Sequence, residues 1–261
     1  MSAANVNGNP IGGRVREFSV AAAFLTRLPL RPSGLVGCGD LATAAWAFPL
    51  VGVIVGGVAG CTLWVAAQWN LDPLVCALLG LVAGSLITGA LHEDGLADFA
   101  DGLGAGGDRS RRLEIMRDSH LGVYGVLALV FSVGLRAGAV GGIGEPGMAI
   151  CAILAAAIVS RGLLPMIMVL TPPARADGLG RSAGRPDLTN ALVALGLAVI
   201  GTVLFMEPGL AITALIAAML AAGVIAIQAK RSIGGHTGDV LGAAQQVSEI
   251  VVLTAAGAVY L

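Results

Sequence analysis

The chain has 261 residues, of which 56% are hydrophobic and only 12% are charged. Soluble domains carry about 25% charged residues, so this composition argues against a water-soluble globule. A net charge of −1 and 4% aromatic residues give little attraction or stacking surface for nucleic acid, so we expect no nucleic-acid partner. These figures leave the class of integral membrane proteins, and we predict a single all-α domain over residues 1–261.

Apolar runs follow one another along the chain. A helix needs about 20 residues to cross a hydrocarbon core of about 30 Å. A shorter run near 15–28 contains charges and two prolines at its end, and it predicts an interfacial or re-entrant helix after a flexible tail over 1–14. The runs that predict a polytopic bundle of about seven spans cover about 41–69, 73–92, 121–142, 147–170, 189–207, 208–228 and 238–261.

The charges of the connecting segments predict which end faces the cytoplasm. The short turns around Asp72, Glu145 and Glu207 contain no Lys or Arg, whereas the N-terminal segment and the other three loops are rich in them. By the positive-inside rule, the basic segments are cytoplasmic and the C-terminus is outside. The long polar loops all fall on this side, so we expect the chemistry at the cytoplasmic face of the cell membrane.

The first long loop opens with three acids on one helical face. Asp94, Asp98 and Asp101 are spaced i, i+4, i+7, which places them within an arc of about 60°. Such carboxylates repel one another unless a cation lies among them. Their hard oxygen ligands suit Mg²⁺, with substrate phosphate oxygens completing its shell. The alternative to a metal site is that these acids form a solvated helix face. Glu93 points away from the arc and is not expected to be a primary ligand.

Further polar groups follow in the same loop. Arg109 and Arg117 are candidate hydrogen-bond donors to a substrate phosphate, although positive-inside anchoring explains loop arginines equally well. Asp118 and Ser119 precede the third span, and capping of its first turn is one expectation for them.

Charged residues also lie inside predicted spans. Arg136 is expected to extend to the outer surface, whereas Arg161, near the cytoplasmic end of its span, is expected to reach the acidic site. Asp239 and Glu249 continue polar character into the last span. Because an unpaired polar group in lipid costs a few kcal/mol, they should face the bundle interior.

Several strings occur in one order over nearly the whole chain: FLTRLP at Phe24–Pro29, HEDGLADFADG at His92–Gly102, LEIMRDSHLGVYGVLAL at Leu113–Leu129, SRG at Ser160–Gly162 and GGHTGDVLGAA at Gly234–Ala244. Together they resemble the cobalamin synthase family, also called adenosylcobinamide-GDP ribazoletransferase. The resemblance implies a polytopic membrane enzyme of vitamin B12 nucleotide-loop assembly that requires Mg²⁺. In that reaction, α-ribazole or its 5′-phosphate attacks the cobinamide-side phosphate of adenosylcobinamide-GDP, GMP leaves, and adenosylcobalamin or its phosphate forms.

The resemblance also implies roles for particular residues. The family motif DGxADxxDG matches Asp94, Asp98 and Asp101, which are thereby assigned to metal and pyrophosphate binding. Either Asp118 or Asp101 is expected to accept the proton of the attacking hydroxyl. The substrate-binding candidates are Arg109, Arg117, Ser119, Arg161, Arg175, Thr237 and Asp239.

Two positions depart from the family pattern. His120 stands where many relatives have Arg, and Arg175 follows Pro-Pro-Ala where relatives often show Tyr-Ala. These departures leave open a catalytic duty for His120 and the specific duty of Arg175.

Other functions compete with this one. A CDP-alcohol phosphotransferase motif, DxxDGxxAR, is partly matched from Asp98 to Ala105, but Gly106 occupies the Arg position. A secondary transporter would place its acids at the midplane between repeated halves, whereas here the acids gather at one end. The sequence leaves open the base of the ribazole, and whether the protein is a monomer or a homo-oligomer.

Overall fold

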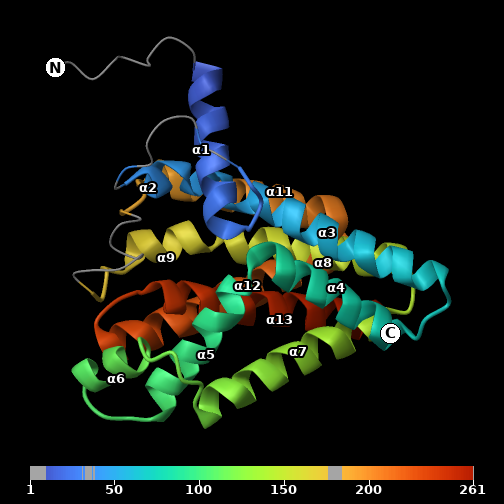
Figure 1. Ribbon diagram of the computed structural model, residues 1–261. Helices are drawn as coiled ribbons and strands as arrows, with labels where there is room; N and C mark the ends of the chain where they lie inside the picture. The colour runs from blue at the N-terminus through green and yellow to red at the C-terminus, as the bar shows by residue number, and fades with distance from the viewer. Residues whose placement is uncertain (1–9, 31, 33–36, 38, 176–183, 261) are drawn as a thin grey trace.

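The computed structural model describes residues 10–30, 32, 37, 39–175 and 184–260, and this part of the chain is helical, with one isolated bridge and no strand. Long helices lie side by side in a bundle (Figure 1). The elements are α1 (Pro10–Leu25), α2 (Asp40–Ala44), the 3₁₀ helix η1 (Ala45–Ala47), α3 (Phe48–Gln68), α4 (Pro73–Thr88), α5 (Leu91–Gly104), α6 (Arg109–Ile115), α7 (Val123–Ile143), α8 (Pro146–Gly162), α9 (Leu164–Leu170), α11 (Leu188–Phe205), α12 (Pro208–Ile233) and α13 (Gly238–Tyr260).

The bundle confirms the predicted class of all-α polytopic membrane protein. In the described residues, six segments are long and apolar enough to cross a membrane, and a bent pair of helices makes up to seven. The six are Asp40–Gln68, Val123–Ile143, Pro146–Leu170, Leu188–Phe205, Pro208–Ile233 and Gly238–Tyr260.

The bent pair replaces the continuous helix expected over about 73–92. α4 ends at Thr88, and α5 begins at Leu91 with its axis turned by 91°. The backbone breaks because Gly89 and Ala90 both adopt the left-handed conformation, with φ of 64° and 56°. This break directs α5, with its acidic face, toward the end of the bundle that carries α6 (Figure 1).

The N-terminal segment is more ordered than expected. α1 starts at Pro10, so residues 10–14 of the expected flexible tail are helical, while 1–9 lie outside the described residues. α1 packs against α2, η1 and α3.

Close helix contacts build the centre of the bundle. α13 contacts α5, α7, α8 and α12, and α3 contacts α8 along much of its length. Small residues allow the α3–α8 approach: a Cβ added at Gly56 would lie 3.0 Å from the Cα of Leu154. In a membrane, where burial from lipid drives little association, such close packing supplies much of the attraction between helices.

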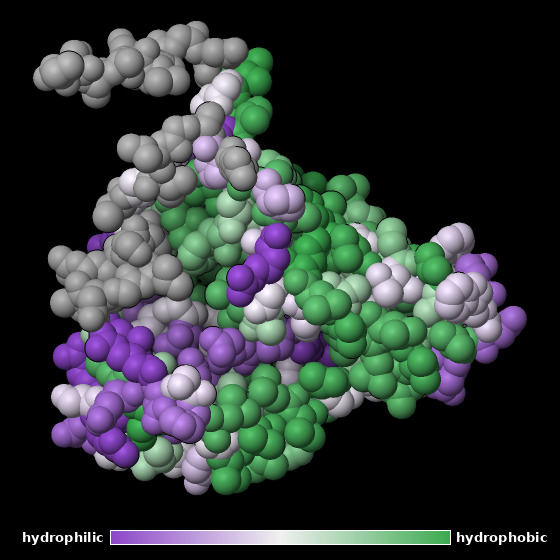
Figure 2. Space-filling view, viewed as in Figure 1, coloured by the Kyte–Doolittle hydropathy of each residue, from purple (hydrophilic) through white to green (hydrophobic). Residues whose placement is uncertain are grey.

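The two ends of the bundle differ in charge. At one end, α4, α8 and α12 each start with an acidic N-cap followed by proline, at Asp72, Glu145 and Glu207. At the other end lie α6 and the basic last turn of α12 with Lys230 and Arg231. Figure 2 shows hydrophilic residues gathered around α6 and a broad hydrophobic surface over the middle of the molecule.

Candidate active site

The acidic face of α5 meets the start of α13 at the α6 end of the bundle. A Cβ at Gly95 would lie 3.1 Å from the Cα of Asp239, and one at Gly242 would lie 3.0 Å from the Cα of Gly95. The two backbones therefore touch where both helices carry acids. Asp94 of α5 and Asp239 of α13 consequently line one pocket.

A loop pairing brings a guanidinium to these acids. His236 N–H donates to the carbonyl of Pro172 at 2.9 Å, and Ala174 N–H donates to the carbonyl of His236 at 2.8 Å. This pairing fixes the loop before Arg175, whose Nη1 lies 3.7 Å from Asp239 Oδ2. Thr237 Oγ1 donates to the same oxygen at 3.0 Å. The predicted site residues Arg175, Thr237 and Asp239 thus form one cluster.

Asp98 lies in a strongly negative environment. Burial, together with the nearby charges of Asp94, Asp239 and Asp101, raises the pKa of Asp98 to about 7, against the opposing effect of Arg175. Asp98 lies outside the six spanning segments, because α5 is not among them. Within the described residues, no hydrogen bond or ion pair holds the carboxylates of Asp94 and Asp98, and no three His, Cys, Asp or Glu side chains are grouped closely enough to hold a metal ion by themselves.

Asp101 contacts the backbone of α7. Its Oδ2 accepts from Gly122 N–H at 2.8 Å and its Oδ1 accepts from Gly125 N–H at 2.9 Å, and the residue is 7% exposed. Asp101 therefore caps α7 and joins it to α5. Each oxygen retains a lone pair, so the metal and proton-acceptor roles expected of Asp101 remain predictions.

The capping role expected of Asp118 and Ser119 is wrong. α7 begins at Val123 after the N-cap Gly122, and Asp101 binds its first amides. Asp118 is instead exposed and accepts from the backbone N–H of His120 at 3.0 Å. His120 Nδ1 lies 2.6 Å from the same Asp118 oxygen, and these hydrogen bonds lower the pKa of Asp118 below its usual value.

Three arginines line a hollow beside the acidic cluster, which consists of Asp94, Asp98 and Asp239 together with Arg175. Arg109, Arg117 and Arg175 surround a space of about 350 Å³. Arg109 spans the α6 end of the bundle, donating from Nε to the carbonyl of Ile233 at 2.7 Å and from Nη2 to the carbonyl of Ala174 at 2.6 Å. Arg175 is common to the acidic cluster and this hollow, so a phosphate group could contact both.

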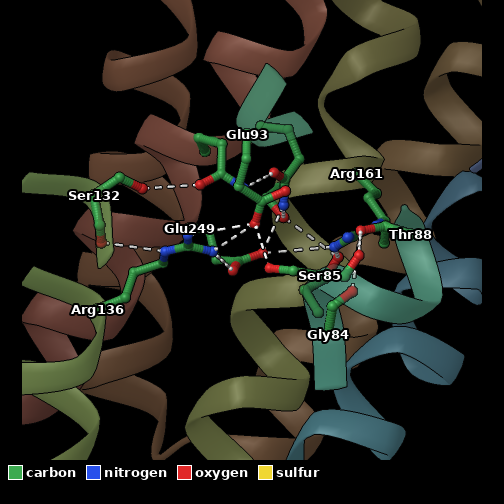
Figure 3. A network of polar contacts seen from close by, with 12 residues as sticks. Gly84, Ser85, Thr88, Glu93, Ser132, Arg136, Arg161 and Glu249 are labelled. Carbon is green, nitrogen blue, oxygen red and sulfur yellow. Dashed lines mark hydrogen bonds and ion pairs between the residues drawn. The ribbon is translucent and has the colours of Figure 1, made fainter. Parts of the chain in front are cut away.

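The remaining candidate, Arg161, lies in a buried ionic network (Figure 3). Its Nη1 lies 3.6 Å from Glu249 Oε2, and Arg136 Nη1 lies 3.0 Å from Glu249 Oε1. Arg136 Nη2 also lies 3.4 Å from Glu93 Oε1. Arg136 is 3% exposed, so the expectation that it extends to the outer surface is wrong, because carboxylates inside the bundle pair with it. Glu249 faces the interior, as predicted.

The network joins the start of α5 to the membrane helices. Glu93 of α5 is held by Arg136 of α7 and by Ser85 of α4, whose Oγ donates at 3.1 Å. Glu249 of α13 links this group to Arg161 of α8. Because Glu93 directly precedes Asp94, these contacts fix the direction of the acidic face. The sequence offered one signal for this network, namely charges placed in otherwise apolar spans.

The fold and its charged end define a polytopic α-helical membrane protein with polar groups suited to a phosphate-bearing ligand. The family model for cobalamin-5-phosphate synthase matches residues 17–257. The chain belongs to this family.

Named relatives cover almost the full length of the chain. A protein of Bradyrhizobium diazoefficiens named adenosylcobinamide-GDP ribazoletransferase is 45% identical over 244 residues, which are 94% of each chain. A protein of Rhizobium etli with the same name is 42% identical, covering 93% of this chain and 98% of its own. No solved structure matches the chain. Family membership decides between the enzyme and transporter alternatives that the motifs left open.

Proposed function

We propose that this protein catalyses the reaction for which its relatives are named, the transfer of a ribazole to adenosylcobinamide-GDP. A ribose hydroxyl oxygen forms a bond to the cobinamide-side phosphorus, the phosphorus–oxygen bond to GMP breaks, and a protein carboxylate takes the hydroxyl proton. The observation that carries the proposal is the cluster of Asp94, Asp98 and Asp239 with Arg175, next to the arginine-lined hollow.

The acidic cluster fits Mg²⁺ as the cofactor. Mg²⁺ at phosphoryl-transfer sites is held by one or two carboxylates together with phosphate oxygens and waters, so a cage of three protein ligands is not required. The carboxylates of Asp94 and Asp98 are free of hydrogen bonds in the described part of the chain, and their mutual repulsion favours a cation. We propose Asp94, Asp98 and Asp239 as the principal ligands, with Asp101 adjacent. Bound there, Mg²⁺ would neutralise charge on the pyrophosphate.

The chain's own groups orient the substrates. Arg175 presents a planar guanidinium whose two arms suit phosphate oxygens. Arg109 and Arg117 extend positive charge along the hollow, where the departing nucleotide phosphate would lie. Phosphoryl transfer needs mainly this alignment and charge stabilisation.

Asp118 is the proton acceptor that we favour over Asp101. Both oxygens of Asp101 already accept backbone amides, whereas Asp118 is exposed. The hydrogen bonds from His120 lower the pKa of Asp118 and orient its carboxylate, and the exposed imidazole of His120 offers a route for the proton to water. Ser119 lies beside this pair as a substrate-binding candidate.

We further propose that this end of the bundle faces the cytoplasm of the cell membrane. The basic residues of α6 and of the last turn of α12 support it through the positive-inside rule. A Ser110→Cys variant should react with a membrane-impermeant maleimide in inverted vesicles and be protected in intact cells. A Glu207→Cys variant, in the opposite turn, should behave in the reverse way.

Reconstituted protein tests the activity itself. Liposomes containing the protein should release GMP and form adenosylcobalamin in equal amounts when given adenosylcobinamide-GDP, α-ribazole and Mg²⁺. Omission of α-ribazole should abolish GMP release. GMP release that continues at the same rate without α-ribazole would show hydrolysis instead of transfer and contradict the proposal.

A further inference from the structure

Three buried polar atoms in the interior of the bundle have no hydrogen-bond partner among the described residues. They are Nε2 of His92, Oε2 of Glu93 and Nε of Arg161. His92 and Arg161 are 3% and 2% exposed, so these atoms are out of reach of bulk solvent. A buried polar group without a partner is costly, and a charged group more so. Each of the three atoms therefore requires a partner that the described side chains do not supply.

The residues that carry these atoms all line one small cavity. It lies between α3, α4, α5, α7, α8 and α13 and has a volume of about 40 Å³. The charged ends of Glu93, Arg161 and Glu249 converge in this region (Figure 3). A water molecule needs about 10–15 Å³ of such volume and about two to four polar partners. The cavity is therefore large enough for more than one water.

The chemistry of the three atoms favours water over an ion. Nε of Arg161 carries a hydrogen and can only donate, Oε2 of the Glu93 carboxylate can only accept, and Nε2 of His92 does either according to its tautomer. A cation in the cavity would face the guanidinium groups of Arg136 and Arg161, and an anion would face the carboxylates of Glu93 and Glu249. Water both donates and accepts, so it satisfies the whole set without adding a charge.

Water in this cavity would connect α8 to the start of α5. Arg161 of α8 donates to the carbonyl of Ala157 at 3.1 Å and lies 3.6 Å from Glu249 of α13, and in the described part of the chain no hydrogen bond or ion pair joins it to α5. His92 and Glu93 lie in the first turn of α5, directly before Asp94 of the acidic cluster. Because a bridging water is nearly as favourable as a direct hydrogen bond, it can hold this turn against Arg161.

We infer that the cavity is a binding site for structural water, and that Arg161 and His92 act through this water as positioning residues for the acidic face of α5. The water site is independent of the reaction, whereas the positioning role rests on the proposed function. Arg161 thus contributes to the active site from the bundle interior, without contact with substrate.

Radiolytic hydroxyl-radical labelling with mass spectrometry tests the water site in the wild-type protein in liposomes, without substrate. Radicals formed from a bound water oxidise the side chains beside it. Leu253 lines the cavity and is 2% exposed, whereas Leu215 is 8% exposed and does not line it. Leu253 should be oxidised several times faster than Leu215. Equal oxidation, or faster oxidation of the more exposed Leu215, would overturn the inference.

Paired substitutions of His92 test the positioning role. His92→Leu removes the polar atom at similar size and should raise the Mg²⁺ concentration for half-maximal GMP release about tenfold, as expected for one lost hydrogen bond. His92→Gln keeps a polar group and should change it less than about threefold. Calorimetric titration with Mg²⁺ in the absence of substrate should give the same order. Packing alone would favour leucine over glutamine in this interior, so the reverse order would overturn the positioning role.

Arg161→Lys provides a second variant if the His92 variants do not fold. Lysine keeps the charge near Glu249 but lacks the Nε–H group, so the Mg²⁺ requirement should rise while the KM for adenosylcobinamide-GDP at saturating Mg²⁺ stays unchanged. The matched control is Arg231→Lys, at the exposed end of α12, which should alter neither value.

A rise in the KM for adenosylcobinamide-GDP with an unchanged Mg²⁺ requirement would show that Arg161 contacts substrate, and would overturn its positioning role. A wild type that releases no GMP but in which Leu253 is labelled faster than Leu215 would uphold the water site and contradict the proposed function.

Discussion

Asp101 provides a quantitative test of how the site is held together. The Asp101→Ala variant removes the acceptors of two backbone N–H groups at the start of α7, with N···O distances of 2.8 and 2.9 Å. Hydrogen bonds to a charged group contribute about 1.5–3 kcal/mol each, so we expect the free energy of unfolding to fall by about 3–6 kcal/mol. Asp101→Asn retains one oxygen acceptor and should lose about half as much.

Asp108 offers a matched control on the same segment. It is an exposed N-cap of α6 that accepts one N–H, from Arg111 at 2.8 Å, so Asp108→Ala should cost about 1 kcal/mol. Reversible unfolding in detergent, followed by circular dichroism, measures all three variants. Equal losses for Asp101→Ala and Asp108→Ala would refute the assignment of Asp101 as the link between α5 and α7.

Three further predictions concern the network, the guanidinium and the metal. Glu249→Gln removes a charge facing Arg136 and Arg161, and should lower the free energy of unfolding by about 3–5 kcal/mol, whereas the exposed Glu207→Gln should change it by less than about 0.5 kcal/mol in the same denaturation assay. Arg175→Lys loses the two-armed donor and should raise the KM for adenosylcobinamide-GDP about tenfold, measured by GMP release, and an unchanged KM would exclude a phosphate contact. Chelation by EDTA should stop GMP release and Mg²⁺ should restore it; activity that persists after chelation would contradict the metal proposal.

Much of the architecture could be predicted because hydropathy reports directly on the solvent around each helix. The break between α4 and α5 could not, since the apolar run continues past it and the left-handed conformation of Ala90 gives no sequence signal. The buried ionic network could be predicted only in part. The sequence shows that Arg136 and Glu249 are charges within spans, but their pairing depends on how α7 and α13 are rotated about their axes.

The acidic cluster could also be predicted only in part from the sequence. The spacing of Asp94 and Asp98 predicted one helix face, and the structure adds Asp239 through the contact of Gly95 with α13. Asp101 has the same spacing but binds amides 21 and 24 residues away, a long-range contact that helical periodicity cannot reveal. Local sequence patterns therefore identified the acidic residues, whereas tertiary packing determines that Asp101 binds backbone amides and that Asp239 lies beside α5.

GMP release by Asp94→Asn and Asp98→Asn, in liposomes with saturating adenosylcobinamide-GDP and α-ribazole, tests most directly whether these carboxylates hold the catalytic cation. Asp108→Asn, in the same acidic segment but outside the cluster, is the control. We predict that kcat falls at least about 100-fold in each cluster variant, because the charge that holds the cation and aligns the pyrophosphate is lost, while the control retains its activity. Cluster variants that keep kcat within about threefold of the control would contradict it.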